Sequence, residues 1–105
     1  MQHPNQLINK IRTVIGQMEP NAKILLYGSY ARGTQSQKSD IDILVLLDKS
    51  EISREDEIRI KYPLYELEFE YGVIISPLVL SSSEWLENHK VTPFYKNVIN
   101  EAIEL

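Results

Sequence analysis

The chain has 105 residues, of which 43% are hydrophobic and 25% are charged, and its formal net charge is −4. We expect a single domain over residues 1–105, because this length leaves no room for a second core. The acidic balance argues against a nucleic-acid binder with a broad basic face, since phosphate neutralisation needs clustered Lys and Arg.

Several other classes of site and protein find no support in the sequence. Cysteine is absent, which excludes disulfides, thiolate metal sites and catalytic thiols. His3 and His89 are far apart in the sequence, so a histidine-based metal or acid–base site is not expected. The chain starts without a signal-peptide pattern, and no apolar run approaches about eighteen residues. We therefore expect no membrane association and a cytoplasmic location.

The first third of the chain predicts a helix, a strand and a short helix. Residues 4–18 form an amphipathic pattern in which apolar side chains recur every three or four residues. A short apolar run at 22–27 ends at Gly28, and its length favours a buried strand over a helix. Residues 29–32 predict a short helix, and the polar stretch 33–39 predicts an exposed loop.

The middle of the chain predicts a central strand and a long helix. Residues 40–47 continue after two aspartates as a run that is apolar on both faces, which is typical of a strand covered on both sides. Ser53 predicts the N-cap of a helix with acidic residues in its first turn, and Gly72 suits its C-terminal end. Pro63 falls inside this helix and predicts a kink or a break into two helices.

The last third predicts one more strand and two helices. Pro77 lies within the strand expected at 73–80 and cannot donate a ladder hydrogen bond, so this strand should lie at an edge or carry a bulge. Serines at 81–83 predict the cap of a short helix over 84–88. Thr92 starts the last helix, whose expected apolar stripe is Phe94, Val98, Ala102 and Leu105. The whole order predicts a small sheet with helices packed against it.

Two pairs of residues in the region 28–42 can carry chemistry. Asp40 and Asp42 stand at the start of the central strand, where carboxylates two residues apart project from one face and can share a divalent cation. Gly28 permits a tight turn and the close approach of a phosphate to the backbone. The Ser29 hydroxyl and the N–H groups entering the short helix can hold phosphate oxygens. The two pairs together indicate a site for a nucleotide and Mg²⁺.

The spacing of these pairs resembles the signature of the polymerase-beta-type nucleotidyltransferases. The chain reads Gly28-Ser29-Tyr30-Ala31-Arg32-Gly33 and then Ser39-Asp40-Ile41-Asp42-Ile43-Leu44-Val45. This pattern is especially similar to that of the minimal nucleotidyltransferases, and the length and order of elements agree over nearly the whole chain. The resemblance implies the polymerase-beta-like fold of the α+β class, with a small mixed β-sheet and helices packed against it.

The resemblance also implies roles for the site residues. Gly28 and Ser29 would contact the β- and γ-phosphates of a nucleoside triphosphate, whereas Asp40 and Asp42 would be the catalytic residues that hold Mg²⁺. A hydroxyl of the acceptor would attack the α-phosphorus and expel pyrophosphate. Members of this subgroup often act as antitoxins of a HEPN-domain toxin, and some transfer AMP to a tyrosine of that toxin.

Arg32 and Ser39 are two further candidates for contact with the nucleotide. Arg32 can bind phosphate bidentately through its guanidinium group, or it can form an ion pair that holds the loop. Ser39 and its neighbour Lys38 flank the aspartates, and each can either contact the nucleotide or remain a solvated part of the loop.

The acceptor class is constrained by the composition and the length. An acidic chain favours a protein hydroxyl over a nucleic-acid end as the acceptor. An aminoglycoside-type drug-modifying transferase fits less well, because such enzymes generally need further domains to hold the acceptor. Together with these constraints, the resemblance implies Mg²⁺ as cofactor, ATP as co-substrate, transfer of AMP to a hydroxyl, and a HEPN-domain toxin as the protein partner.

One position departs from the family pattern. Active members usually carry a third Asp or Glu on the next strand, where it joins the two aspartates and can serve as general base, but Ser76 occupies the matching place here. Serine is a weak neutral ligand and no base at pH 7. Glu66, Glu68 and Glu70 lie on the preceding helix and are expected to point to solvent. Two interpretations stay open, an active transferase and a catalytically weak or inactive antitoxin that neutralises a HEPN-like partner.

Overall fold

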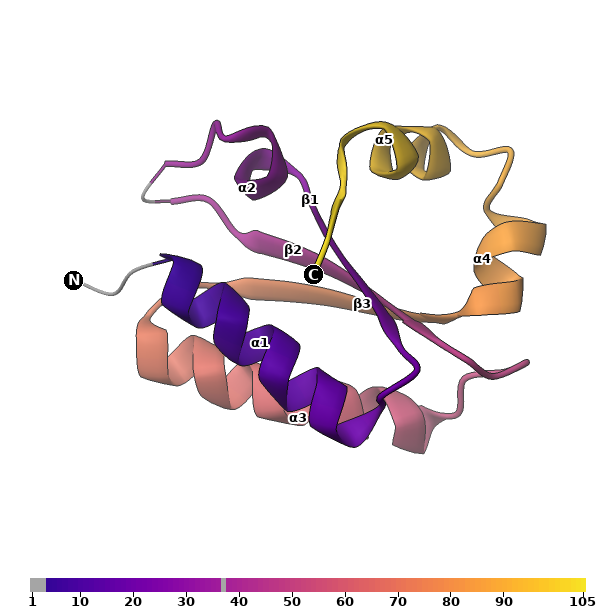
Figure 1. The fold of residues 1–105 in the computed structure, drawn as a ribbon, viewed down its shortest axis with the longest axis horizontal. Helices are drawn as coiled ribbons and strands as arrows, with labels where there is room; N and C mark the ends of the chain where they lie inside the picture. Colours follow the sequence, from indigo (N-terminus) through magenta and orange to yellow (C-terminus); the bar gives the residue numbers. More distant parts are fainter. Residues whose placement is uncertain (1–3, 37) are drawn as a thin grey trace.

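The computed structural model of the chain describes residues 4–36 and 38–105. Helices and strands follow one another as shown in Figure 1, in the order α1 (Pro4–Met18), β1 (Lys23–Tyr27), α2 (Ser29–Arg32), β2 (Ile41–Leu47), α3 (Arg54–Tyr71), β3 (Ile75–Ser81), α4 (Ser82–Asn88), α5 (Pro93–Glu101) and β4 (Ile103–Glu104). The predicted α+β class is confirmed.

The strands form one mixed sheet in the order β3-β2-β1-β4. β2 pairs antiparallel with β1 and parallel with β3, and β1 also pairs antiparallel with β4. β2 is therefore flanked on both sides, as its apolar run predicted, and β3 is an edge strand, as Pro77 predicted. Because β2 and β3 run in the same direction, both begin at the end of the sheet where β1 finishes.

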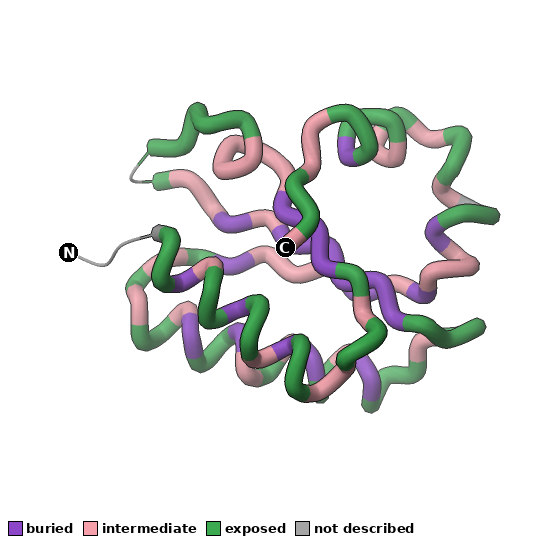
Figure 2. The backbone as a smooth tube through the Cα atoms, viewed as in Figure 1, coloured by how far each residue is buried: buried purple, intermediate pink, exposed green. Residues whose placement is uncertain are grey.

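Helices cover both faces of this sheet. α1 and α3 lie side by side on one face, and α4 and α5 lie over the other (Figure 1). Along β2, Ile41 and Ile43 are buried under α1 and α3. Leu44 and Leu46 belong to a second core, which includes Trp85 of α4. Figure 2 shows that the buried positions are concentrated in the strands and on the inner sides of α1 and α3.

The first three predicted elements are confirmed. α1 has the predicted bounds, and its Leu7, Ile11 and Ile15 are buried. β1 begins one residue later than expected, and α2 covers the predicted residues. In the part of the chain that the structure describes, no helix combines the length and apolarity that a membrane span requires.

The caps predicted for α3 are also confirmed. The Ser53 hydroxyl accepts a hydrogen bond from the Asp56 backbone N–H at 3.0 Å, and the Asp56 carboxylate accepts one from the Ser53 backbone N–H at 3.0 Å. This reciprocal pair is a capping box. Gly72 ends the helix in the left-handed conformation, with a φ of 69°.

Of the two outcomes predicted at Pro63, a kink or a break into two helices, the break is wrong. α3 is one helix of 18 residues, with Pro63 inside it. Ile60 lies before the proline and Leu64 and Leu67 lie after it, and all of them are buried against the sheet. Their packing holds both halves of the helix in place and outweighs the hydrogen bond that proline cannot donate.

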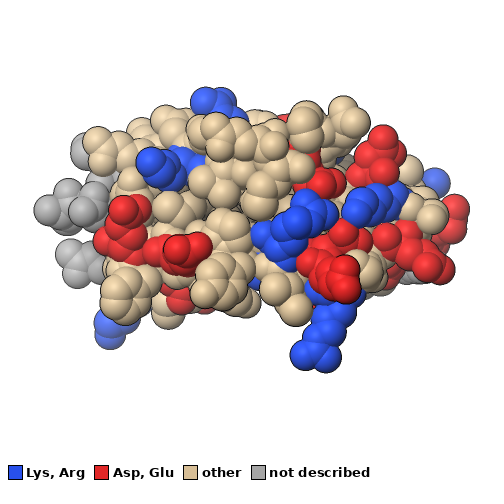
Figure 3. Space-filling model, turned by 90° about the horizontal axis from the view of Figure 1, so that it is seen from below, with Lys and Arg blue, Asp and Glu red and all other residues tan. Residues whose placement is uncertain are grey.

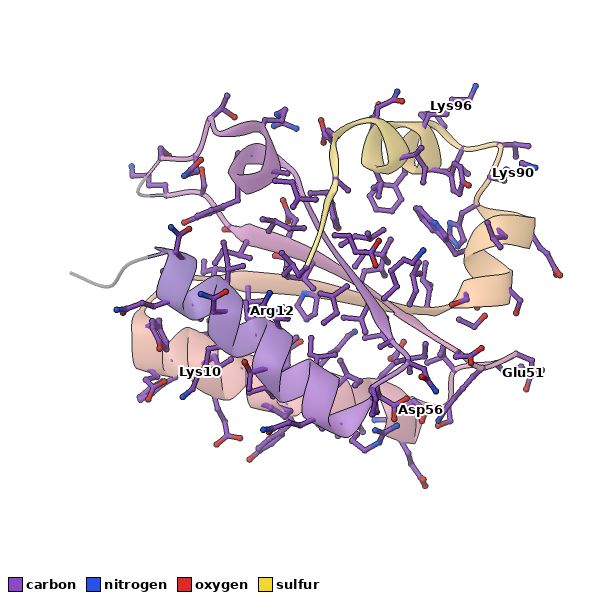
Figure 4. All side chains as sticks on the ribbon, viewed as in Figure 1. Lys10, Arg12, Glu51, Asp56, Lys90 and Lys96 are labelled. Atoms are coloured by element: carbon purple, nitrogen blue, oxygen red, sulfur yellow. The ribbon has the colours of Figure 1, made fainter. Side chains whose placement is uncertain are left out.

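Asp56 is the centre of an ion-pair network at the start of α3 (Figure 4). Its carboxylate accepts hydrogen bonds from Lys49 Nζ at 2.6 Å and from Arg59 Nη2 at 3.0 Å. The hydrogen bond from Lys49, followed by those from Ser53 and Arg59, holds the pKa of Asp56 well below its usual range. The network ties the loop after β2 to the first turn of α3.

This lowered pKa predicts a pH-dependent contribution of Asp56 to stability. Because the folded state prefers the ionised carboxylate, the contribution is fully present above the unfolded pKa of about 4 and is lost as the pH falls below it. We expect Asp56→Asn to lower the melting temperature at pH 7, and the difference from wild type to shrink steadily below about pH 4. Circular dichroism melts at several pH values measure this. Asp48→Asn, at an exposed position, is the control, and a constant difference for Asp56→Asn would contradict the network's role.

The C-terminal third differs in detail from the prediction. α5 ends at Glu101, and a two-residue strand, β4, follows and pairs with β1. Leu105 therefore does not continue the helical stripe: its N–H donates to the Ile24 carbonyl at 2.9 Å, and its side chain packs against the core under α1. β3 begins at Ile75 and α4 at Ser82, two residues later and two residues earlier than expected. A strand as short as β4 has no apolar periodicity by which the sequence could predict it.

Candidate active site

The pairing of β1 with β2 brings Gly28 and Asp42 together. Tyr27, the last residue of β1, is the register partner of Asp42, so Gly28 lies beside the aspartate's carboxylate. A Cβ atom at position 28 would lie 2.3 Å from Asp42 Oδ2, and the backbone there has a φ of 75° and a ψ of −156°. Both the close approach and these dihedral angles require glycine. The two motifs predicted from the sequence therefore meet at one place.

α2 begins immediately after this contact. The backbone N–H groups of Ala31 and Arg32 both donate to the Gly28 carbonyl at 3.1 Å. The N–H groups of Ser29 and Tyr30 precede these bonds, so they have no partner within the helix. Together with the half-buried Ser29 hydroxyl, they are the type of donor that binds phosphate oxygens.

Asp40 and Ser76 lie at the same end of the sheet. The parallel register pairs Asp42 with Ser76, and the Ser76 hydroxyl donates a hydrogen bond to Asp40 Oδ2 at 3.4 Å. The sequence predicts a strand that begins at residue 40, but Asp40 stands one residue before β2. Ser76 thus stands next to both aspartates, where the family pattern would have its third carboxylate.

The electrostatics of this cluster disfavour negative charge. Burial raises the pKa of Asp42 above its usual range, and the Asp40 carboxylate raises it further, whereas the Arg32 guanidinium lowers it. Burial and the Asp42 charge also raise the pKa of Tyr27. The positive charge of Arg32 therefore compensates the negative charge of the Asp42 carboxylate only in part.

Arg32 makes an ion pair in this structure. Its Nη1 donates to Glu101 Oε1 at 3.0 Å, which joins α2 to the last residue of α5. For Arg32 the sequence allows either phosphate contact or an ion pair, and the structure contains the ion pair. The guanidinium is about half exposed, at 49%, and it also acts electrostatically on Asp42, so it remains within reach of a ligand at the cluster.

Ser39 is used within its own loop. Its hydroxyl accepts a hydrogen bond from the Ser36 backbone N–H at 2.8 Å, and its backbone N–H donates to the Ser36 carbonyl at 3.1 Å. These bonds close a turn just before Asp40. The exposed Lys38 belongs to the same turn.

Other residues singled out from the sequence lie in different surroundings. Glu68 is not simply solvated, because its Oε2 accepts a hydrogen bond from the Ile75 backbone N–H at 3.3 Å, at the start of β3. Glu66 and Glu70 are exposed, as expected. His89 stacks against Trp85 with ring centroids 5.7 Å apart, and His3 lies outside the described residues.

Two residues near the cluster are not predicted by the sequence motifs. Tyr27 borders Asp42 and packs edge-to-face on Phe94, with ring centroids 5.4 Å apart. Glu101 holds Arg32 from a distance of 69 positions in the sequence. Tyr27 could have been noticed as the residue before the glycine turn. No sequence pattern connects Glu101 with the motif.

The donor atoms of this cluster fit a hard divalent cation. Asp40 and Asp42 offer carboxylate oxygens and Ser76 offers a hydroxyl, and oxygen ligands are those that Mg²⁺ prefers. A cation would relieve the repulsion that raises the pKa of Asp42. Over residues 4–36 and 38–105, no three His, Asp or Glu side chains form a metal-binding group. The carboxylate part of such a site is thus limited to the two aspartates.

Comparison with known sequences agrees with this geometry. The model of the family described as nucleotidyltransferase domain matches residues 8–104. A candidate protein adenylyltransferase of Methanocaldococcus jannaschii is 39% identical over 84 residues, which cover 76% of this chain and 73% of that protein. A second one from the same organism is 33% identical over 84 residues, which cover 79% of this chain and 77% of that protein.

Solved structures share the fold. A crystal structure of a toxin–antitoxin with AMP-PNP aligns with a TM-score of 0.63 and 20% identity, covering 97% of this chain and 72% of that chain. A mutant of the toxin–antitoxin MntA-HpeT aligns with a TM-score of 0.63 and 24% identity, covering 93% of this chain and 70% of that chain. The family match over nearly the whole sequence confirms the resemblance seen in the Gly-Ser and Asp-x-Asp motifs. The chain belongs to the nucleotidyltransferase domain family.

Proposed function

We propose that this chain is an Mg²⁺-dependent adenylyltransferase that transfers AMP from ATP to a hydroxyl group of a partner protein. The observation that carries this proposal is the contact between the two motifs. The Asp42 carboxylate lies so close to Gly28 that a Cβ atom there would be 2.3 Å from Oδ2. A phosphate chain held at the start of α2 would therefore lie directly beside the two aspartates.

In the proposed reaction, each element of the site has a separate task. Gly28, Ser29 and Arg32 bind the β- and γ-phosphates, with Ser39 ordering the loop beside them. The acceptor oxygen forms a bond to the α-phosphorus while the bond from that phosphorus to the α–β bridging oxygen breaks, and pyrophosphate leaves with the electron pair. The acceptor proton passes to water, since the Ser76 hydroxyl is no base.

Asp40 and Asp42 have the task of holding the cation. When bound, Mg²⁺ neutralises phosphate charge and stabilises the charge that develops in the transition state. The half-buried position of both carboxylates favours this role, because a cation compensates the negative charge that the protein itself leaves partly uncompensated.

The choice of ATP and of a protein acceptor is supported by the relatives. Two relatives at 39% and 33% identity carry the name of protein adenylyltransferases, and a structural neighbour was solved with AMP-PNP. The net charge of −4 disfavours a nucleic-acid acceptor. Both neighbours are toxin–antitoxin structures, which agrees with a HEPN-domain toxin as the partner and with action in the cytoplasm, where ATP is available.

The test is a transfer assay with ATP labelled at two different positions. The chain is incubated with Mg²⁺, its co-purified partner and ATP that carries the label on either the α- or the γ-phosphate. We expect the α-label to become protein-bound and the γ-label to appear in pyrophosphate. Transfer of the γ-label to protein would identify a kinase and overturn the proposal, and omission of Mg²⁺ should abolish transfer.

A second candidate function is supported by Ser76. With a neutral hydroxyl where a third carboxylate would serve as ligand and base, the chain would act as a binding module that neutralises a HEPN-like partner with little or no catalysis. Calorimetry separates the two functions. This second candidate predicts tight binding of the partner in the absence of ATP, and neutralisation that persists when Asp42 is replaced.

The position of Ser76 makes a further prediction. Ser76→Asp adds a carboxylate beside Asp40, which lies 3.4 Å from the present hydroxyl. We expect metal affinity to rise by roughly tenfold, the equivalent of about 1.4 kcal/mol, and turnover to increase with it. Manganese titration followed by electron paramagnetic resonance measures the affinity. Ser76→Asn is the control of similar size without charge, and equal behaviour of the two variants would contradict the assignment of Ser76 to the metal site.

A further inference from the structure

A row of large apolar side chains lies exposed on the outer side of α3. Ile58, Tyr62, Tyr65 and Phe69 are 53%, 65%, 51% and 93% exposed. They are separated by four, three and four positions, so they form one continuous stripe along the helix. The buried side of the same helix is formed by other residues, Ile60, Leu64 and Leu67. α3 is therefore apolar on two sides, and only one of them meets the sheet.

The stripe is accompanied by two grooves that meet at Tyr62 and Tyr65. One groove, of about 320 Å³, is lined by the N-terminal half of the stripe. The other, of about 390 Å³, is lined by the C-terminal half, up to Phe69. With 150–250 Å² for each large side chain, the exposed fractions correspond to an apolar patch of roughly 500 Å², at the upper end for a monomeric protein.

The charges beside the stripe differ between its two halves. Arg54 and Lys61 line the N-terminal groove together with a single acid, Glu57. Glu66 lines the C-terminal groove, and Glu70 follows it on the exposed surface. Figure 3 views the molecule from the side of α1 and α3, and it shows uncharged side chains across the middle, with acidic and basic side chains toward both ends.

We propose that this stripe is the interface of a homodimer in which the α3 helices of two copies pack antiparallel. In this arrangement Ile58 of one copy faces Phe69 of the partner copy, and the two tyrosines form the centre. In this register Lys61 of one copy faces Glu66 of the other, whereas Glu57 faces Glu70. A parallel arrangement would place Lys61 against Lys61 and Glu66 against Glu66, so the charge pattern selects the antiparallel one.

The size of the patch limits the area that the dimer can bury. A standard interface buries about 800 Å² on each partner, so the stripe with its charged margins supplies a small interface. We therefore expect a reversible dimer with a dissociation constant in the micromolar range. The interface lies on the face opposite α4 and α5 and does not involve the Gly28–Asp42 contact, so the dimer is independent of the proposed function.

Sedimentation velocity over a range of concentrations tests the dimer. The wild type should shift from monomer to dimer between about 1 and 200 µM, and Phe69→Asp should raise the dissociation constant at least about tenfold. Val91→Asp changes another highly exposed apolar side chain, at 84%, away from α3, and should leave the dissociation constant unchanged. Asp42→Asn should also dimerise normally. A wild type that stays monomeric at 200 µM, or a Phe69→Asp variant that dimerises as well as Val91→Asp, would overturn the proposal.

Disulfide trapping tests the antiparallel orientation, because the natural chain has no cysteine. Ile58 and Phe69 are eleven positions apart, or roughly 16 Å along the helix, which is too far for a disulfide between equivalent positions. In the antiparallel dimer, Ile58→Cys mixed with Phe69→Cys should therefore form a mixed disulfide dimer under mild oxidation, while each variant alone should form little disulfide crosslink. Efficient crosslinking of each variant with itself, without the mixed product, would indicate a parallel pair and overturn the arrangement.

Discussion

Asp42→Asn is expected to abolish nucleotidyl transfer while leaving the fold intact. The substitution removes one of the two carboxylates available to the cation, whose transition-state stabilisation is worth several kcal/mol. Since each 1.36 kcal/mol corresponds to a factor of ten, the rate should fall by roughly 10³-fold or more. Transfer of the α-label from ATP measures this loss. Activity that survives the substitution would remove Asp42 from the proposed site.

For the stability of Asp42→Asn we expect no loss, in contrast to its activity. Burial and Asp40 raise the pKa of Asp42 in the folded state, so folding is opposed by the ionised carboxylate at pH 7. An uncharged amide of the same shape removes this opposition. We therefore expect the melting temperature of Asp42→Asn to be equal to or higher than that of the wild type. Asp48→Asn, at the exposed position that follows β2, is the control and should keep full activity.

Gly28→Ala is expected to damage both stability and nucleotide binding. The new Cβ would lie 2.3 Å from Asp42 Oδ2, and alanine would have to adopt a φ of 75° with a ψ of −156°, a region essentially restricted to glycine. The backbone strain alone costs about 1–3 kcal/mol, which lowers the melting temperature by roughly 4–8 °C for each kcal/mol. Displacement of the carboxylate should weaken ATP–Mg²⁺ binding at least about tenfold.

Gly33→Ala is the matched control for this experiment. Gly33 ends α2 with the same φ of 75°, but a Cβ there would meet nothing within 4 Å. The left-handed conformation costs a non-glycine residue roughly 1–2 kcal/mol, so Gly33→Ala should lose stability too. Its ATP–Mg²⁺ affinity in calorimetry should remain near that of the wild type. Equal losses of affinity in both variants would show that the Asp42 contact is not what position 28 provides.

The elements with strong local signals could be predicted from the sequence. The apolar period of α1, the capping residues of α3 and the apolar run of β2 each act within a few neighbouring residues, and the structure confirms them. Pro77 likewise predicts an edge strand, because a residue without a backbone N–H cannot donate a ladder hydrogen bond, and β3 does lie at the edge of the sheet. The predicted break at Pro63 does not occur for a non-local reason. Residues on both sides of the proline pack on the sheet, and this packing keeps α3 a single helix.

The sequence predicts which residues belong to the candidate site better than it predicts the contacts between them. The motif spacing named Gly28 and Asp42, but their direct contact follows from the register of β1 against β2. The ion pair between Arg32 and Glu101 joins residues 69 positions apart, and the short strand β4 holds the chain beside it. Such pairings depend on the assembled tertiary structure, which periodicity and composition do not encode.

The position of the site residues along the chain has a consequence for how the site assembles during folding. Gly28 and Asp42 are fourteen positions apart and are joined by a neighbouring antiparallel pair, whereas Ser76 reaches Asp42 only after the long crossover through α3. Contacts between nearby residues close with less loss of chain entropy and form faster than distant parallel ones. The glycine–aspartate contact can therefore form as a local unit, and the third side of the site is added when β3 docks.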